Sequence, residues 1–142
     1  HRQMLAGFFE THSLDLLSQS VMERIPAYLA SGGTSLLMSA RDREGRLAAF
    51  DVADFGARDF AFYMFNVVSR KTGIPGASDL LLSRIIEAAR EKGRRFLNLG
   101  LGIHKGVAFF KEKWGATPFL EHRSCTYRVA RPPAMADLLG RL

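Results

Sequence analysis

The feature of the sequence that most restricts its fold is an almost unbroken apolar run between positions 59 and 68. The run contains Phe60, Phe62, Tyr63 and Phe65 and carries little polar character. Such a run is typical of a strand that is covered on both faces of a sheet. A buried helix is the competing interpretation, but the hairpin pattern directly before the run favours a strand. We therefore expect a central strand over 59–68.

The segments before this run predict a helix followed by a hairpin. Apolar residues recur at helical spacing over 13–30, where Pro26 is expected to kink the last turn. Residues 3–9 form a possible earlier helix. Two apolar stretches, 34–40 and 46–55, flank a polar turn that ends at Gly45, which is typical of an antiparallel hairpin.

The segments after the run alternate between helical and strand patterns. A loop over 69–77 precedes a predicted helix over 79–92, for which Ser78 and Asp79 offer capping and first-turn acidic groups. We then expect a strand over 96–101, a helix over 106–114 and a long strand over 117–129. This order predicts a mixed sheet with helices packed on its faces.

Composition bounds the class of protein. The 142 residues, 47% of them apolar and 24% charged, suit one folded domain, which we place at 1–131 with a short tail at 132–142. No apolar run reaches the roughly 20 residues of a membrane-spanning helix. The chain starts without a leader pattern, so we expect no signal peptide and a cytoplasmic protein. It also fits a piece of a longer protein.

Cysteine, histidine and charge exclude some chemistries and leave others open. Cys125 is the only cysteine and the four histidines lack metal-ligand spacing, so we expect no disulfide and no metal site. Nothing near Cys125 in the sequence predicts an activated thiol. The net charge of +6 favours anionic partners such as phosphate-bearing cofactors, nucleic acid or lipid, but it does not choose among them.

The loop after the apolar run predicts a phosphate site. Glycines let the backbone approach an anion, and the first N–H groups of a helix have no internal partner. Arg70 and Lys71 stand at the start of this loop, and Gly73 and Gly76 lie within it. A plain connecting loop is the alternative interpretation of these residues alone.

Two motifs in this context resemble the GNAT acyltransferases. The sequence from Arg70 to Ala77, Arg-Lys-Thr-Gly-Ile-Pro-Gly-Ala, is similar to that family's [RQ]-x-x-G-x-[GA] loop, with one residue inserted before Gly76. The segments 98–102 and 106–116 resemble the strand and the FK-x-x-[FW]-G-A helix of its Fem-like branch, which covers aminoacyltransferases of peptidoglycan synthesis and related acyl-CoA-dependent enzymes. The resemblance extends over residues 14–129.

The resemblance implies a fold and a reaction. The fold is a mixed, mostly antiparallel sheet with helices on both faces, and the family's first strand is not visible in this sequence. A preceding domain or a second copy would then cover the open edge. The reaction is transfer of an acyl group from acyl-CoA to a small-molecule or peptide amine. An aminoacyl-tRNA donor, which the basic second half would suit, and a degenerate binding module are the alternatives.

The resemblance also implies roles for individual residues. The donor lies between two strands that separate, and a backbone N–H near Val67 stabilises the oxyanion. The residues expected to hold coenzyme A are Val67, Val68, Arg70, Lys71, Gly73, Gly76, Ala77 and Ser78. The catalytic candidates are Lys111, which stands where many relatives carry Tyr, together with His104 as a general base and Asn98 as a bridge between the strands. Asp51, Glu121 and His122 are further base candidates.

Overall fold

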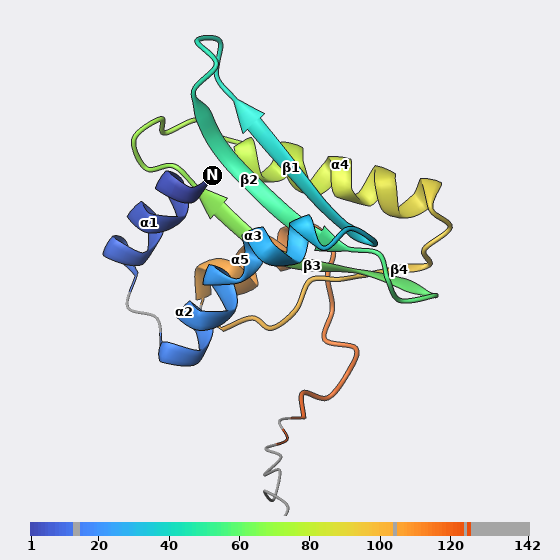
Figure 1. The fold of residues 1–142 in the computed structure, drawn as a ribbon. Coiled ribbons are helices and arrows are strands. Elements are labelled where there is room, and N and C mark those ends of the chain that lie inside the picture. Colours follow the sequence, from blue (N-terminus) through green and yellow to red (C-terminus); the bar gives the residue numbers. More distant parts are fainter. Residues whose placement is uncertain (13–14, 104, 124, 126–142) are drawn as a thin grey trace, which may run out of the picture.

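The computed structural model describes residues 1–12, 15–103, 105–123 and 125. Within them five helices and four strands follow one another in the order that the sequence predicts, except that the last predicted strand is not among them (Figure 1). Their bounds are α1 Arg2–Thr11, α2 Leu16–Glu23, α3 Ile25–Ala30, β1 Ser35–Arg41, β2 Leu47–Asp54, β3 Phe60–Val68, α4 Ala77–Glu91, β4 Phe96–Asn98 and α5 Lys105–Lys113.

The four strands form one mixed sheet in the order β1-β2-β3-β4. The first three strands pair antiparallel, and β4 pairs parallel to β3 after the crossover through α4. The predicted mixed, mostly antiparallel sheet is therefore confirmed. Among the described residues β1 and β4 are the two edge strands, so both edges carry backbone groups without a neighbouring strand.

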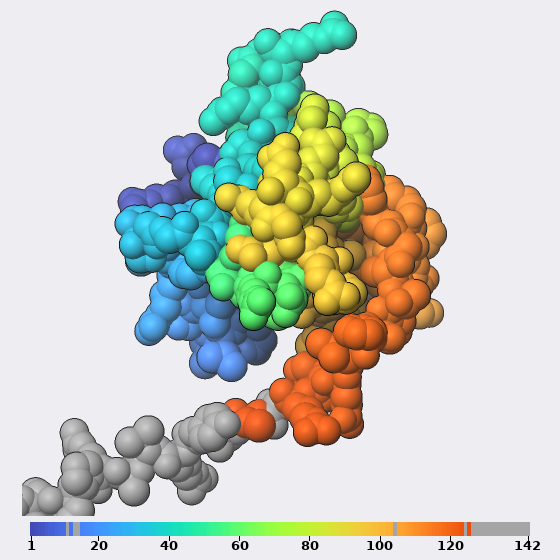
Figure 2. Space-filling view, turned by 90° about the vertical axis from the view of Figure 1, so that its right-hand side faces the viewer, coloured from blue at the N-terminus to red at the C-terminus, as the bar shows by residue number. Residues whose placement is uncertain are grey.

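Helices cover both faces of this sheet, as predicted. On one face α4 packs through Leu82 and Ile85 against β2 and β3. On the other face Leu5 of α1 and Ile25 of α3 pack against Phe50. In Figure 2 the blue α1–α3 segment and the yellow-to-orange α4–α5 segment lie on opposite sides of the molecule.

The most buried strand is β2 and not the aromatic strand β3. Every residue of β2 from 48 to 53 is buried, whereas β3 is buried only at Ala61, Tyr63 and Val67. The prediction that the 59–68 run is covered on both faces is thus wrong in part. The two ends of the strand, Phe60 and Val68, are exposed, and the remaining residues between the buried ones are half-buried.

The predicted helix over 13–30 is two helices within the described residues. Asp15 caps α2 by accepting hydrogen bonds from the N–H groups of Leu17 and Ser18, each 3.0 Å long. The helical segment is interrupted at Arg24, which ends α2 and precedes α3. Pro26 lies in the first turn of α3, where its missing N–H leaves no helical hydrogen bond unmade. Pro26 therefore begins a new helix instead of kinking the old one.

The late strands differ most from prediction. The strand predicted over 96–101 ends at Asn98, and residues 117–123 and 125 form no strand. Pro118 has no backbone N–H to donate to a neighbouring strand. The Phe119 ring stacks on Phe96, with the ring centroids 6.0 Å apart. Residues 126–129 of the predicted strand and the tail at 132–142 lie outside the described residues. In the part of the chain that is described, no helix is long and apolar enough to cross a membrane.

Candidate functional site

The pairing between β3 and β4 stops after three residue pairs. Phe60, Ala61 and Phe62 pair with Phe96, Leu97 and Asn98, and no later pair follows. The Asn98 side chain then accepts a hydrogen bond of 2.8 Å from the N–H of Gly100, whose φ of +67° turns the chain away. The strand β3 continues to Val68 without β4. The pairing of the two strands thus ends at Phe62 and Asn98.

The backbone of β3 beyond Phe62 presents donors to this unpaired side. The Ser69 N–H donates to the Ala48 carbonyl at 2.8 Å, and Val67 pairs with Phe50 in the same register. Antiparallel pairs alternate between bonded and non-bonded residues, so the Val67 N–H also faces β2. The N–H groups of Asn66 and Val68 consequently face away from β2. The donor expected near Val67 belongs to these two neighbours.

A bulge in β3 lies between the paired and unpaired parts of the strand. Val52 pairs with Phe65 and Ala53 pairs with Tyr63, which leaves Met64 as an extra residue on β3. A bulge bends a strand and increases its local twist. The bulge at Met64 therefore redirects β3 just after its last pair with β4.

The loop after β3 delivers the chain to the start of α4. Gly73 and Gly76 have positive φ values of +52° and +78°, and a Cβ at either position would meet nothing within 4 Å. The need for glycine here is conformational and not steric. Gly76 is the N-cap of α4, and no side chain caps the helix. The prediction that Ser78 caps the helix is wrong, because Ser78 lies inside the first turn and its hydroxyl bonds to Asn66. The prediction that Asp79 is an acidic residue of the first turn is confirmed.

The first turn of α4 exposes backbone donors without partners. The first helical hydrogen bond runs from the Leu80 N–H to the Gly76 carbonyl, 2.9 Å away. The N–H groups of Ala77, Ser78 and Asp79 have no acceptor among the described residues. The dipole of the helix adds partial positive charge at this end. The side chains of Arg70 and Lys71 are exposed beside this turn.

Each of these three residues is tied to a different element through its side chain. Ala77 packs against Ala48 and Ala49 of β2. Ser78 bonds to Asn66 of β3, with its Oγ 3.1 Å from Nδ2 and 3.2 Å from Oδ1. Asp79 Oδ1 accepts from Trp114 Nε1 at 2.8 Å and pairs with Lys113 at 2.5 Å. The turn is thus fixed on three sides.

A buried carboxylate lies behind this turn. Asp51 of β2 is fully buried, and its Oδ1 accepts from Asn66 Nδ2 at 2.6 Å. Its Oδ2 and the hydroxyl of Tyr63 are buried without a hydrogen-bond partner among the described residues. Burial raises the pKa of Asp51 to about 6, against the lowering effect of the hydrogen bond from Asn66. Burial, followed by the nearby Asp51 charge, also raises the pKa of Tyr63.

Lys111 of α5 reaches the point where the two strands part. Its Nζ donates a 2.5 Å hydrogen bond to the Leu101 carbonyl, just beyond β4. A Cβ at Gly100 would lie 4.0 Å from this Nζ and 3.6 Å from the Phe62 ring. Burial lowers the pKa of the Lys111 ammonium, and no carboxylate pairs with it in the described part of the chain. A partly buried cation therefore lies near Phe62 and Gly100, where the pairing between β3 and β4 ends.

The positions of the other candidate residues add little to the description of the site. The Asn98 side chain bonds within its own strand end and forms no bridge to β3 among the described contacts. His104 lies outside the described residues. Glu121 pairs with the exposed Arg123, and His122 and Cys125 are exposed. No group of potential metal ligands occurs in the residues that the structure describes.

Comparisons with solved structures address the fold. A ribosomal-protein-alanine N-acetyltransferase from Brucella melitensis biovar Abortus 2308 matches with a TM-score of 0.64 and 16% identity over 88% of each chain. AAC(6')-Iy, solved with the bisubstrate analog CoA-S-monomethyl-acetylneamine, matches with a TM-score of 0.57 and 15% identity over 79% of this chain and 80% of its own. The chain has the fold of the GNAT acetyltransferases.

The same fold also occurs in a protein described by another role. A transcriptional regulator from Bacillus halodurans C-125 matches with a TM-score of 0.65 and 15% identity over 89% of this chain and 95% of its own. No protein-family model matches the chain, and a search of curated proteins gave no significant match. At these identities the likeness to a GNAT domain concerns the fold alone.

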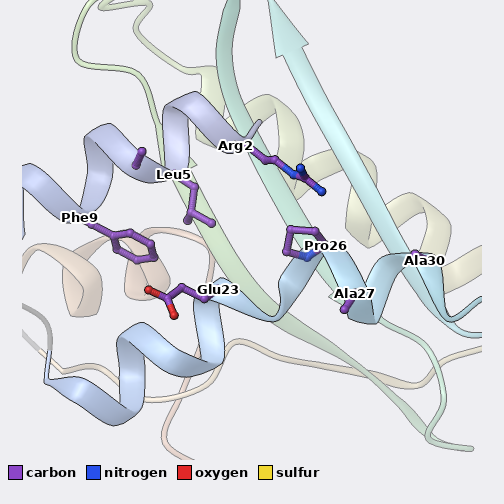
Figure 3. A pocket seen from close by; sticks show the side chains of 8 residues that line it. Arg2, Leu5, Phe9, Glu23, Pro26, Ala27 and Ala30 are labelled. Carbon is purple, nitrogen blue, oxygen red and sulfur yellow. The ribbon is translucent and has the colours of Figure 1, made fainter.

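A groove lies on the face of this GNAT fold that α1 and α3 cover. It measures about 530 Å³ and is open to solvent (Figure 3). Its lining is apolar except for Arg2 and Glu23, and it consists of Arg2, Leu5, Ala6, Phe9, Glu23, Pro26, Ala27 and Ala30. None of these residues belongs to the loop after β3, to α4 or to α5, so the groove is separate from the candidate site.

Sequence reasoning missed the side chains that support the site. Asn66 was not singled out, Asp79 was expected only as a first-turn acid, and Trp114 was considered only as part of the 106–116 motif. A signal was present for Asn66, since Asp51 and Asn66 are both polar residues inside otherwise apolar strands. Buried polar side chains need partners, so such pairs of interruptions point to a contact across the sheet. The register now shows that Asp51 and Asn66 are direct neighbours.

Proposed function

We propose that this protein transfers an acyl group from acyl-CoA to an amine. One observation carries the proposal. The unpaired N–H groups of β3 at Asn66 and Val68 lead through the glycine loop into the uncapped first turn of α4. A donor molecule with an extended arm and a pyrophosphate would find backbone donors along its whole length.

The pyrophosphate would bind at the start of α4. The N–H groups of Ala77, Ser78 and Asp79 supply donors, and Gly73 and Gly76 leave open space around the loop. The exposed Arg70 and Lys71 add positive charge. Ser78 contributes its backbone and not its hydroxyl, because the hydroxyl is bonded to Asn66. The amide groups of the pantetheine arm would pair with the free edge of β3 beside Val68.

The chemistry then needs charge stabilisation at two atoms. The lone pair of the amine attacks the thioester carbonyl, and one of the two N–H groups, that of Asn66 or that of Val68, stabilises the resulting oxyanion, because N–H groups two residues apart in a strand are too far apart to donate to one oxygen. The C–S bond breaks as the carbonyl reforms, and the thiolate leaves with the electron pair. Lys111 lies beside the strand separation and is suited to protonate this thiolate, because its pKa is lowered. The amine nitrogen gives up its own proton to solvent or to a base.

The assignment to the Fem-like branch rests on α5. The branch motif supplies Lys111 and Trp114, and both have defined contacts at the candidate site. The nature of the acceptor is left open in this proposal. The structural neighbours include an enzyme named for alanine of a ribosomal protein and one solved with a neamine conjugate, which are unrelated acceptors. Specificity in such folds comes from variable loops.

The test is calorimetric titration of the protein with acetyl-CoA and with coenzyme A. Gly76→Asp would place a carboxylate in the anion site, and Gly76→Asn is the matched control. Both substitutions share the strain of φ +78° and have open space, so they differ only in charge. We expect wild type and Gly76→Asn to bind, and Gly76→Asp to lose roughly 10-fold or more in affinity, as expected for repulsion between close charges.

Two outcomes would contradict the proposal. Equal coenzyme A affinity of Gly76→Asp and Gly76→Asn would show that the pyrophosphate does not bind at the start of α4. No heat with either ligand, for a wild-type protein that is folded by circular dichroism, would exclude an acyl-CoA donor. The aminoacyl-tRNA donor and the degenerate binding module would then be tested next, beginning with titration of charged tRNA.

A further inference from the structure

The buried Asp51 takes no part in the proposed chemistry, yet it is costly to keep. It is fully buried, its Oδ2 has no partner among the described residues, and the neighbouring Tyr63 hydroxyl is equally unsatisfied. Burial of a carboxylate with half of its hydrogen bonding unmet destabilises a fold. An apolar residue would suit this position better if packing were its only role.

The contacts of Asp51 lead to the first turn of α4. An ionised carboxylate only accepts hydrogen bonds, so it requires the Nδ2 group of Asn66 to face it. The observed 2.6 Å contact has this arrangement. The same Asn66 amide also holds the Ser78 hydroxyl, whose Oγ lies within hydrogen-bond distance of both amide atoms, 3.1 Å from Nδ2 and 3.2 Å from Oδ1. A single chain of contacts thus joins β2, β3 and the second residue of α4.

We propose that Asp51 is a positioning residue, which fixes Ser78 through Asn66 and thereby orients the backbone N–H groups that receive the donor pyrophosphate. The inference rests on the proposed function for its ligand, but the positioning of the turn does not depend on that function. Ala77 and Asp79, on either side of Ser78, have anchors of their own. Loss of the Ser78 anchor therefore loosens the middle of the turn and leaves the helix in place.

The experiment is a double-mutant cycle of Asp51→Leu and Ser78→Ala, in which Asp51→Leu removes the acceptor for Asn66 Nδ2. Coenzyme A affinity is measured by calorimetry, and pantetheine, which lacks the pyrophosphate, is measured by NMR titration. Each single variant should weaken coenzyme A binding roughly 3- to 10-fold, as expected for one net hydrogen bond. Pantetheine affinity should not change. In the Ser78→Ala background, Asp51→Leu should cause no further weakening, because its route to the turn is already broken.

Other results would overturn the inference. Removal of a negative charge could by itself tighten anion binding, and equal tightening in both backgrounds would show that Asp51 acts through charge alone. Additive weakening would show two independent effects. Equal loss of coenzyme A and pantetheine affinity would show general damage to the fold.

A ligand-free readout separates this inference from the proposed function. Order parameters of the Ala77, Ser78 and Asp79 N–H groups are measured by NMR relaxation in the free protein. Asp51→Leu and Ser78→Ala should each lower these order parameters, and the double variant should match Ser78→Ala. If wild type bound no coenzyme A, the proposed function would fail while this measurement still decided the positioning role. Unchanged order parameters in Asp51→Leu would overturn that role.

Discussion

The most informative single side chain is Lys111, because its surroundings differ from those of the other described lysines near it. Lys113, two residues on, has a carboxylate partner in Asp79, whereas Lys111 donates to the carbonyl of Leu101. Partial burial without a counter-charge disfavours the ammonium form and lowers its pKa. A cation of this kind gives up a proton more readily than an exposed lysine. This property suits an acid that protonates a leaving thiolate.

The role of Lys111 predicts a specific kinetic defect. Lys111→Gln keeps the side chain polar but removes the transferable proton, so thiol release from acetyl-CoA with a panel of primary amines should fall roughly 100-fold. The affinity for coenzyme A should change less than about 3-fold, because general acid catalysis acts on the transition state. Lys105→Gln, at the exposed other end of α5, is the control and should keep wild-type turnover.

A different division of the effect between coenzyme A affinity and turnover would assign Lys111 to donor binding. If Lys111→Gln weakened coenzyme A binding as strongly as it slowed turnover, the side chain would act on the phosphates. Restoration of turnover by Lys111→Arg would also argue against proton donation, because the guanidinium stays protonated at all working pH values.

At the scale of elements, the structure shows how α5 is fixed to α4. α5 has no fully buried residue, and its contacts with the core come from the half-buried Phe110 and Trp114. Its polar attachment is Asp79, which accepts from Trp114 Nε1 and pairs with Lys113. The helix that carries Lys111 is thus held to the helix that would carry the phosphates, so their relative position depends on this contact.

The two bonds to Asp79 should contribute unequally to stability. Trp114→Phe removes the half-buried hydrogen bond and some apolar contact, and we expect it to lower the free energy of unfolding by about 1–2 kcal/mol. Lys113→Gln removes an ion pair whose side chains are 46% and 35% exposed, and solvent screening should limit its cost to under about 0.5 kcal/mol. Urea denaturation at pH 7 measures both. A larger cost for Lys113→Gln would contradict this ranking.

Periodicity and turn residues were sufficient to predict most elements. The hairpin, β3, α4 and α5 lie within a few residues of their predicted places, because each has a strong local pattern bounded by glycine or polar residues. The break at Arg24 was not predicted, since the apolar spacing continues through it and Pro26 fits either a kink or a new helix start. The order of the predicted elements supplied the mixed sheet, whereas the resemblance supplied its mostly antiparallel pairing and the strand separation, which no local pattern determines.

Long-range contacts account for what the sequence could not predict. Ser78 looked like a helix cap, but its hydroxyl is bonded to Asn66, and the cap is Gly76, two residues earlier, with φ +78°. Trp114 packs against the core, and its Nε1 also bonds to Asp79, 35 residues away in the sequence. Local pattern assigns such side chains by type, whereas their partners depend on the register of β2, β3 and α4.

At the scale of the whole molecule, burial of one carboxylate should be visible in the pH dependence of stability. Asp51 lies in the most buried strand, and its pKa rises from 3.8 to about 6 because it is desolvated. Between pH 3.8 and about pH 6 the folded protein holds a proton on Asp51 that the unfolded chain has lost. The contribution of Asp51 to stability is therefore greatest below about pH 4 and decreases as the pH rises through 6.

The difference between wild type and Asp51→Asn isolates this effect from all other titrating groups. The free energy of unfolding of wild type, relative to the variant, should fall by about 2 kcal/mol between pH 4 and pH 7. Asp15→Asn is a control of opposite sign, because the hydrogen bond from the Ser18 side chain lowers the pKa of Asp15. Wild type should lose stability relative to that variant as the pH falls. A flat Asp51 difference in urea denaturation from pH 4 to 7 would mean that Asp51 titrates normally and is not desolvated in the folded protein.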